Sequence, residues 1–230
     1  MSTLNGGPGN IVTNGLVLYL DAANYLSYTS GSTTWRDLSP SNISGSLING
    51  PTFSSTNAGS IVFDGVNDYC DLATFSGLGS TNRTLCAWVK VNTVVGSNQA
   101  IIEFPNSGSL DQTAIHLGHD NTRIVTGFGG SPYNGYVYVV TGFSTNTWYN
   151  ISCVISGSVV NAYANGVFVG TATNTGPVET NPIGQIGRYN SYFSGNYSNC
   201  SVSISQLYNR ALTASEVLQN YNATKARFGL

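Results

Sequence analysis

Short apolar runs recur along most of the chain, separated by segments rich in glycine, serine, threonine and asparagine. Each run has the length of a β-strand, and the runs follow one another at about the spacing typical of an all-β sandwich or barrel. The expected strands span residues 15–22, 46–48, 60–63, 69–72, 83–90, 100–104, 114–117, 123–128, 136–141, 148–155, 159–164, 167–172, 183–188 and 202–208. The pattern therefore predicts an all-β protein.

Three of these runs have distinctive faces or neighbours. Residues 15–22 are apolar on both faces, which predicts a strand in the centre of a sandwich. Residues 159–164 and 167–172 flank Asn165-Gly166, a dipeptide suited to the positive φ angles of a type I′ turn. We expect a tight hairpin there.

The hydrophobic period changes near the C-terminus. Thr213 and Glu216 have the spacing of a capping box, and Val217, Leu218 and Tyr221 then fall on one face of a helix. The sequence predicts one short helix that begins after Thr213, ends near residue 225 and docks on the sandwich.

An acidic turn lies between the expected strands 60–63 and 69–72, which we interpret as a hairpin-like corner. It carries Asp64, Asn67, Asp68 and Asp71, and the chain has only ten acidic residues. Asp64, Asn67 and Asp68 are candidate calcium ligands, because calcium prefers several oxygen ligands. The alternative, which we favour, is an Asx-type turn in which these side chains accept hydrogen bonds from backbone amides.

The length of the chain predicts one domain, and its low charge excludes some classes of binding partner. The 230 residues suffice for one large domain, which we place at residues 15–230 after an extended glycine-rich arm at residues 1–14. A neighbouring subunit or the domain itself could hold this arm. Charged residues make up 8% of the chain and the net charge is −2, so nucleic acid and anionic membranes are poor partners.

The spacing of the cysteines and the lengths of the apolar runs indicate the compartment in which we expect the protein to be made. Cys70, Cys86, Cys153 and Cys200 lack metal-binding spacing, and we expect buried thiols rather than disulfides. The N-terminal residues have neither the basic start nor the apolar core of a secretory signal, and no apolar run is long enough to span a bilayer. We expect a soluble product of the cytoplasm.

Aromatic residues gather in two expected loop regions, where they are candidates for ligand binding. A flat ring beside asparagine, serine and arginine suits sugars, although tyrosine also favours protein interfaces and ordinary loop packing. Arg188 and Tyr189, directly after a strand, are the preferred pair at the rim. The candidate ligand-binding residues are Tyr133, Tyr136, Arg188, Tyr189, Tyr192 and Tyr197.

Catalytic motifs are absent from the sequence. Glu103, Glu179 and Glu216 are isolated from one another, whereas glycosidases need paired carboxylates. His116 and His119 are the only histidines and have no nucleophile motif beside them; a transition-metal site there is a minority interpretation. We expect a protein that is not an enzyme.

Seven motifs, in order along the chain, resemble those of laminin-G-like, concanavalin A-like jelly-roll domains. They are Gly15–Ala22 (GLVLYLDA), Trp35–Ser39 (WRDLS), Asn49–Phe53 (NGPTF), Ser60–Tyr69 (SIVFDGVNDY), Leu85–Lys90 (LCAWVK), Tyr163–Gly166 (YANG) and Leu207–Thr213 (LYNRALT). The resemblance implies a two-sheet antiparallel jelly-roll sandwich with one short C-terminal helix. It also implies ligand binding by loops at one rim and, in secreted relatives, a calcium ion.

One position departs from the pattern that the resemblance implies. Many relatives carry an acidic residue where this chain has Ser205 and Gln206, so a carboxylate that could help to hold a cation is missing.

The C-terminal residues 208–221 and 227–230 are similar to those of single-domain members found in structural proteins of tailed bacteriophages. This resemblance implies a virion structural protein made in the host cytoplasm and placed on the virion exterior: a capsid decoration, tail fibre or other appendage subunit. Its partners would be other virion proteins or copies of itself, through the arm and the sheet edges, and host-surface glycans. The alternative is a carbohydrate-binding, lectin-like module that is not part of a virion.

Overall fold

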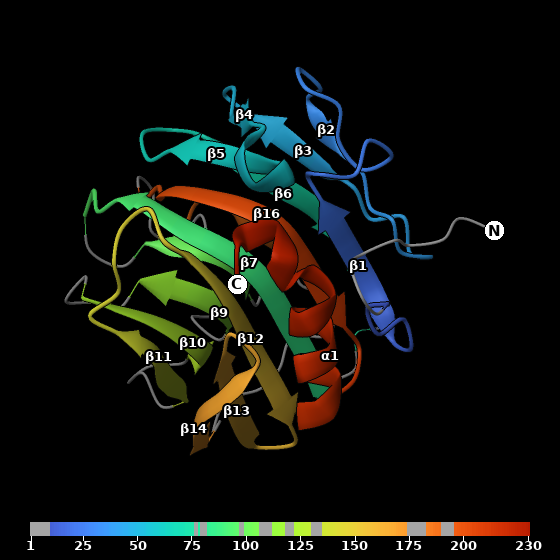
Figure 1. Cartoon of the computed structure of the whole chain (residues 1–230), viewed down its shortest axis with the longest axis vertical. Coiled ribbons are helices and arrows are strands. Elements are labelled where there is room, and N and C mark those ends of the chain that lie inside the picture. Colours follow the sequence, from blue (N-terminus) through green and yellow to red (C-terminus); the bar gives the residue numbers. More distant parts are fainter. Residues whose placement is uncertain are drawn as a thin grey trace.

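The computed structural model describes residues 10–75, 78, 82–96, 99–105, 112–117, 122–129, 135–173, 183–189 and 196–230. For residues 105, 112, 113, 116, 117, 128 and 129 it describes the backbone alone. Two antiparallel sheets of eight strands each pack face to face, and one helix lies on the outside (Figure 1). This is the all-β sandwich that the spacing of the apolar runs predicts.

The first sheet, here sheet A, lies under the helix. Its strands run in the order β14 (Val167–Thr173), β13 (Val159–Ala164), β12 (Trp148–Ser156), β7 (Asn82–Thr93), β16 (Asn199–Tyr208), β5 (Ser60–Asp64) and β4 (Thr52–Ser54), and β1 (Leu16–Asp21) also pairs with β16. The long strand β16 therefore pairs with β7 along one side and with β5 and then β1 along the other.

The second sheet, here sheet B, forms the opposite layer. Its strands run in the order β11 (Tyr136–Thr141), β10 (Arg123–Gly129), β9 (Gln112–Leu117), β8 (Ala100–Pro105), β15 (Ile183–Ile186), β6 (Tyr69–Thr74), β3 (Gly45–Ile48) and β2 (Thr34–Trp35). Alternate residues of each strand enter the core, so the residues between them lie on the outer face.

Strand β1 is buried on both faces but is not central in its sheet, so that part of the prediction is wrong. Leu18 and Leu20 face the main core between the sheets, whereas Leu16 and Tyr19 belong to a second apolar cluster on the outer face of sheet A. The helix covers this second cluster. A strand on one side of β16 can therefore be apolar on both faces.

The helix α1 (Ala214–Thr224) begins at the predicted capping box. Thr213 Oγ1 accepts a hydrogen bond from the Glu216 amide, and Glu216 accepts one from the Thr213 amide. A short 3-10 helix, η2 (Lys225–Phe228), follows, and its Phe228 ring stacks on Trp88 with centroids 3.9 Å apart. The C-terminal residues therefore hold the helix on β7.

The chain segment from β5 to β6 is a corner between the two sheets and not a hairpin. β5 pairs with β4 and β16 in sheet A, whereas β6 pairs with β3 and β15 in sheet B. A further 3-10 turn, η1 (Thr56–Ala58), precedes β5. The prediction of two strands and a turn is confirmed, but the two strands pair with different neighbours.

The described part of the N-terminal arm, residues 10–14, packs on its own domain. Ile11 and Val12 are buried in the second apolar cluster, and the Val12 amide donates to Asn220 Oδ1 at 2.9 Å. Tyr208 Oη donates to the Val12 carbonyl, also at 2.9 Å. The sequence left open whether a neighbouring subunit or the domain itself holds the arm; residues 10–14 are held by the domain itself.

Two further expectations are confirmed. The four cysteines are free and buried, and Asn165 and Gly166 take φ angles of 50° and 77° in the tight turn between β13 and β14. Within the described residues, no helix has both the length and the apolar character needed to cross a bilayer.

Candidate functional site

The acidic turn after β5 is an Asx-type turn, as the favoured alternative predicted. Asp64 Oδ1 accepts hydrogen bonds from the amides of Val66, Asn67 and Asp68 at 2.8, 3.3 and 3.4 Å. Asp68 Oδ2 in return accepts one from the Asp64 amide at 3.3 Å. The carboxylates therefore stabilise the turn through backbone donors.

The same contacts shift the pKa values of the two carboxylates in this turn. Burial raises the pKa of Asp64, but the amide donors outweigh burial, so its pKa is lowered overall. Burial and the neighbouring Asp64 charge raise the pKa of Asp68. In the described part of the chain, no three His, Cys, Asp or Glu residues group closely enough to hold a metal ion, and calcium binding by Asp64, Asn67 and Asp68 stays a prediction.

Many relatives have an acidic residue where this chain has Ser205 and Gln206, but a side chain at these positions is too far from the acidic turn to share a cation with it. Asn199 pairs with Asp64 at one end of β16, and Ser205 lies six residues further along the same strand. At about 3.3 Å per residue, that separation is roughly 20 Å. A carboxylate at position 205 would not reach the Asp64 turn.

Arg188 brings together residues from three separate parts of the chain. Its guanidinium carbon lies 3.8 Å from the centroid of the Tyr69 ring, and its Nη2 lies 3.5 Å from Asp71 Oδ1. Tyr197 pairs with Arg188 in an isolated β-bridge, and its ring centroid is 6.2 Å from that of Tyr69. The sequence pointed to Arg188 and Tyr197 but not to Tyr69 or Asp71.

Gln185 joins this group from the strand beside β6. Its Nε2 donates to Asp71 Oδ1 at 2.8 Å, and it lies opposite Asp71 on one side and Glu103 on the other. Because Cys70, Leu72 and Ile186 face the core, Asp71 and Gln185 lie on the outer face of sheet B. We call Tyr69, Asp71, Gln185, Arg188 and Tyr197 the Arg188 cluster.

The Arg188 cluster runs from the buried interior to solvent. Glu103 is fully buried and Gln185 is 6% exposed, whereas the side chains of Arg188 and Asp71 are 20% and 38% exposed. Asp71 and Arg188 therefore form the solvent-facing end of the cluster, and Gln185 forms its inner end.

Two polar atoms of the cluster lack hydrogen-bond partners among the described residues. One is a donor, Arg188 Nε, and the other is an acceptor, Gln185 Oε1; both atoms are buried. A buried polar atom without a partner costs about 1–3 kcal/mol, so most native structures satisfy such atoms with protein, water or ligand. The cluster thus offers one donor and one acceptor to a bound group.

The structure does not gather all the predicted rim residues in one place. Tyr189 is buried, at 8% exposure, and Tyr136 is on β11, five strands from β6 in sheet B. Tyr133, Tyr192 and His119 lie outside the described residues, as does the side chain of His116. Of the predicted ligand-binding residues that the structure describes, Arg188 and Tyr197 come together in this cluster.

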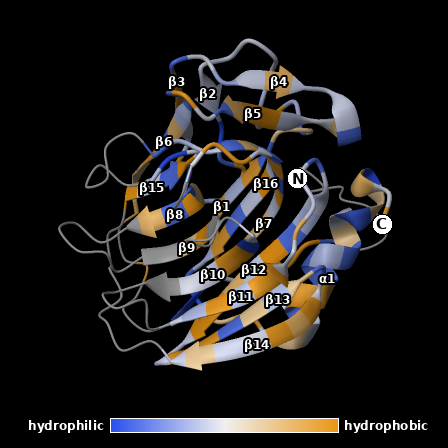
Figure 2. Ribbon diagram, turned by 90° about the vertical axis from the view of Figure 1, so that its left-hand side faces the viewer, coloured by the Kyte–Doolittle hydropathy of each residue, from blue (hydrophilic) through white to orange (hydrophobic). Residues whose placement is uncertain are grey.

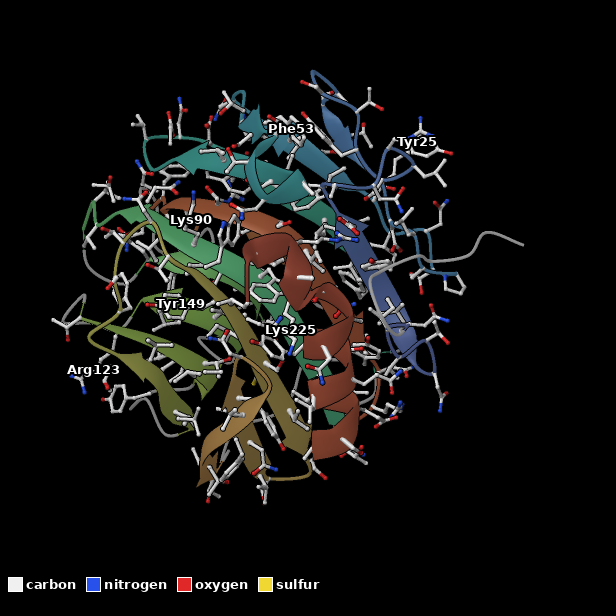
Figure 3. The ribbon with its side chains drawn as sticks, in the orientation of Figure 1. Tyr25, Phe53, Lys90, Arg123, Tyr149 and Lys225 are labelled. Carbon is white, nitrogen blue, oxygen red and sulfur yellow. The ribbon has the colours of Figure 1, made fainter. Side chains whose placement is uncertain are left out.

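A pocket of about 420 Å³ lies away from this cluster, where β3 and the loop before β2 approach β4. Its walls include Tyr28 and Phe53, whose ring centroids are 5.5 Å apart, and no charged side chain. Phe53, labelled in Figure 3, belongs to β4. None of the residues predicted to bind a ligand or metal lines this pocket.

A comparison with known protein families matches residues 64–218 to the Laminin_G_3 family, described as concanavalin A-like lectin/glucanases superfamily. The match covers more than half of the chain and includes the acidic turn, the Arg188 cluster and most of both sheets. The chain belongs to the concanavalin A-like lectin/glucanases superfamily. This membership confirms the broader resemblance seen in the sequence and agrees with the two-sheet sandwich.

Solved structures share the superfamily fold at low sequence identity. Domain 4 of AbnA, an extracellular arabinanase from Geobacillus stearothermophilus solved with arabinotriose, aligns with a TM-score of 0.71 and 16% identity over 91% of this chain and 100% of that domain. The binding domain of Paraclostridial Mosquitocidal Protein 1 aligns with a TM-score of 0.67 and 17% identity over 91% of this chain and 52% of that one. These similarities extend to the fold alone.

A larger protein contains the same fold as one part. Trypanosoma rangeli sialidase, solved with sialic acid, aligns with a TM-score of 0.68 and 16% identity over 93% of this chain and 33% of the sialidase chain. The present chain thus spans about a third of the length of that enzyme. Among curated proteins, none matches this sequence significantly.

Proposed function

We propose that this superfamily member is a non-catalytic carbohydrate-binding protein whose Arg188 cluster receives a sugar. The single observation that carries the proposal is a pair of buried atoms, the donor Arg188 Nε and the acceptor Gln185 Oε1, that have no hydrogen-bond partner among the residues that the structure describes. A hydroxyl group both accepts and donates a hydrogen bond, so sugar hydroxyls satisfy both atoms. A purely anionic or purely cationic group would satisfy one of them.

The aromatic residues of the cluster support the same ligand. Tyr69 and Tyr197 are half-buried; the Tyr69 ring lies against the Arg188 guanidinium, and the Tyr197 ring lies beside that of Tyr69. Such rings provide an apolar surface for the C–H groups of a sugar, while the neighbouring polar atoms bind its hydroxyls. Two proteins of the same fold were solved with saccharides, sialic acid and arabinotriose.

Glycan binding to the purified protein tests this proposal. We expect saturable binding on an array of host-surface polysaccharides, followed by titration calorimetry with the best oligosaccharide. Arg188→Ala should weaken binding about 10- to 100-fold, because hydrogen bonds to charged groups contribute about 1.5–3 kcal/mol. Arg188→Lys should weaken it similarly, since lysine keeps the charge but loses the planar group that stacks on Tyr69.

A second arginine in sheet B provides a matched control. The guanidinium carbon of Arg123 lies 4.1 Å from the centroid of the Tyr138 ring, near the opposite edge of sheet B. Arg123→Ala should leave sugar affinity unchanged. No binding to any glycan, or equal affinity for the Arg188→Ala and Arg123→Ala proteins, would contradict the proposal.

A glycosidase activity is the second candidate, because the fold brings Asp71 and Glu103 to one face of sheet B. Gln185 lies between them, so their backbones are two strand spacings apart, about 10 Å. We favour binding because Asp71 already accepts from Gln185 and Glu103 is fully buried. Reducing-sugar release that Glu103→Gln abolishes would instead establish an enzyme.

We also propose that the protein is an exterior subunit of a tailed-bacteriophage virion, such as a capsid decoration or tail fibre. Its C-terminal motifs and its low content of charged residues, 8%, support this assignment. Mass spectrometry of purified particles should find the protein, and antibody against it should label the particle exterior. Absence from virions that retain infectivity would leave the alternative, a lectin-like module outside a virion.

A further inference from the structure

Strand β14 forms one edge of sheet A and differs from the other sheet edges. In the described structure it pairs with β13 alone and is the last strand of its sheet, as Figure 2 shows at the bottom of the view. Its seven residues leave a row of backbone N–H and C=O groups on the free side. Such a row pairs readily with another strand.

The remaining edges of the two sheets carry protection that β14 lacks. β1 also pairs with one strand alone, but the amide and carbonyl of its Tyr19 are hydrogen-bonded to Asp37 Oδ1 and the Leu38 amide. β2 and β4 are only two and three residues long. β11 is longer, but Arg123 lies over its Tyr138 ring and places a charge at that edge, which Figure 3 shows at the rim of the molecule. Short strands and charged side chains are common ways in which proteins prevent edge pairing.

Apolar side chains are exposed along the first half of β14. Val167, Phe168 and Val169 are 66%, 53% and 42% exposed. No Asp, Glu, Lys, Arg or His occurs anywhere between residues 124 and 178. The strand also lacks proline, so every residue can donate to a neighbouring strand. The single shift of register in the β13–β14 ladder lies near the turn, and the remainder of the strand is regular.

We propose that β14 pairs antiparallel with β14 of a second copy of this chain, about a two-fold axis, so that sheet A continues from one protomer into the other. A second copy fits because each strand then satisfies the free backbone groups of the other in one self-complementary interface. Two uncharged strands meet without like-charge repulsion, and the pairing covers the exposed valines and Phe168. Self-association through β14 does not depend on ligand binding at the Arg188 cluster.

The mass of the protein in solution, measured by light scattering after size-exclusion chromatography, tests this interface. We expect twice the 24.2 kDa of one chain at micromolar concentrations. Val169→Lys places a charge at the free edge and should give the single-chain mass. Val159→Lys is the matched control, because Val159 is also 42% exposed but lies on β13, which is paired on both sides; it should remain dimeric.

A cysteine series tests the arrangement without disturbing the fold. The four native thiols are buried, so a cysteine introduced at Val169, Thr171 or Thr173 is the exposed one. Near the two-fold axis, one of these should form a disulfide-linked dimer on mild oxidation, and cysteine at Val159 should not. A monomeric wild-type protein, dimers that survive Val169→Lys, or no cross-link at any of the three positions would overturn the proposal.

Discussion

Asp21 is a buried carboxylate that forms an ion pair with one arginine from the end of the chain. It is 1% exposed, and Arg227 Nη1 lies 2.9 Å from both of its oxygens. Tyr19 Oη and the Ala23 amide donate the remaining hydrogen bonds, each at 3.0 Å. The ion pair therefore holds η2 against β1, although the two segments are at opposite ends of the sequence.

Removal of Arg227 should strongly destabilise the fold. Arg227→Ala leaves the Asp21 charge buried without its cation, and we expect a loss of about 3–5 kcal/mol in the free energy of unfolding, measured by urea denaturation. Asp21→Asn combined with Arg227→Ala should recover part of the loss, because no charge is then left buried. Arg36→Ala, at an exposed arginine, is the control and should change stability by less than about 0.5 kcal/mol. Equal losses in the single and the double variant would contradict this account.

The sequence identified some residues of the Arg188 cluster and missed others for a physical reason. Arg188 and Tyr197 stood out because they lie in a stretch rich in aromatic residues. Strand alternation could also have shown that Asp71 faces away from Cys70. It could not show that β6 pairs with β15, which brings Asp71 to a glutamine 114 positions away. Strand pairing between distant segments depends on the whole core, and a local pattern does not encode it.

Among the secondary-structure elements, the helix start and the tight turn were predicted correctly from short sequence patterns. The capping box at Thr213 and the turn at Asn165-Gly166 are confirmed because both depend on residues a few positions apart. The central position of β1 was wrong, since burial on both faces depends on α1, which arrives from the other end of the chain. Residues far apart in sequence decide which sheet a strand joins.

The β13–β14 turn gives a test in which backbone strain and steric contact can be separated. Gly166 has φ 77°, and an added Cβ would lie 2.9 Å from Tyr221 Cδ1 and 3.0 Å from Leu218 Cδ1. Gly157 also has positive φ, 58°, but an added Cβ there would meet nothing within 4 Å. Both substitutions to alanine incur the cost of a left-handed conformation, about 1 kcal/mol, and only the methyl group of Gly166→Ala also crowds the Tyr221 and Leu218 side chains of α1.

We therefore expect Gly166→Ala to lower the free energy of unfolding by about 1–3 kcal/mol more than Gly157→Ala, because crowding a packed contact typically costs that much. Thermal and urea unfolding of the two variants measure the difference. If both lose the same amount, the turn does not contribute to holding α1 on the sheet.

The whole molecule has one main core, to which both sheets contribute. Leu85, Ile151 and Leu207 of sheet A and Ile102 and Ile124 of sheet B belong to the same buried cluster. The outer face of sheet A has its own smaller cluster under α1 (Figure 1). A shared core of this kind predicts that the two sheets unfold together, because neither retains its apolar partner when the other leaves.

The four buried cysteines can report on that cooperativity. Cys70 lies on β6 of sheet B, whereas Cys86, Cys153 and Cys200 lie on β7, β12 and β16 of sheet A. Burial raises the pKa of Cys86 to about 11 and that of Cys153 to about 12, and it raises the pKa values of the other two as well. At pH 8 the folded thiols are therefore protonated and inaccessible, and alkylation should follow opening of the fold.

Alkylation by iodoacetamide at pH 8, followed by peptide mass spectrometry, measures each thiol separately. When the protein opens and closes faster than it is labelled, the labelling rate reports the population of the open state. Cys70, Cys153 and Cys200 belong to the main core. These three should then share one opening equilibrium, and its free energy should equal that from urea denaturation, because exposure of any of them requires separation of the two sheets. Cys86 belongs to the outer cluster under α1 and reports the opening of that cluster. Faster labelling of Cys70 than of Cys153 and Cys200 would show that sheet B opens by itself, and the shared core would then not hold the sandwich together as one unit.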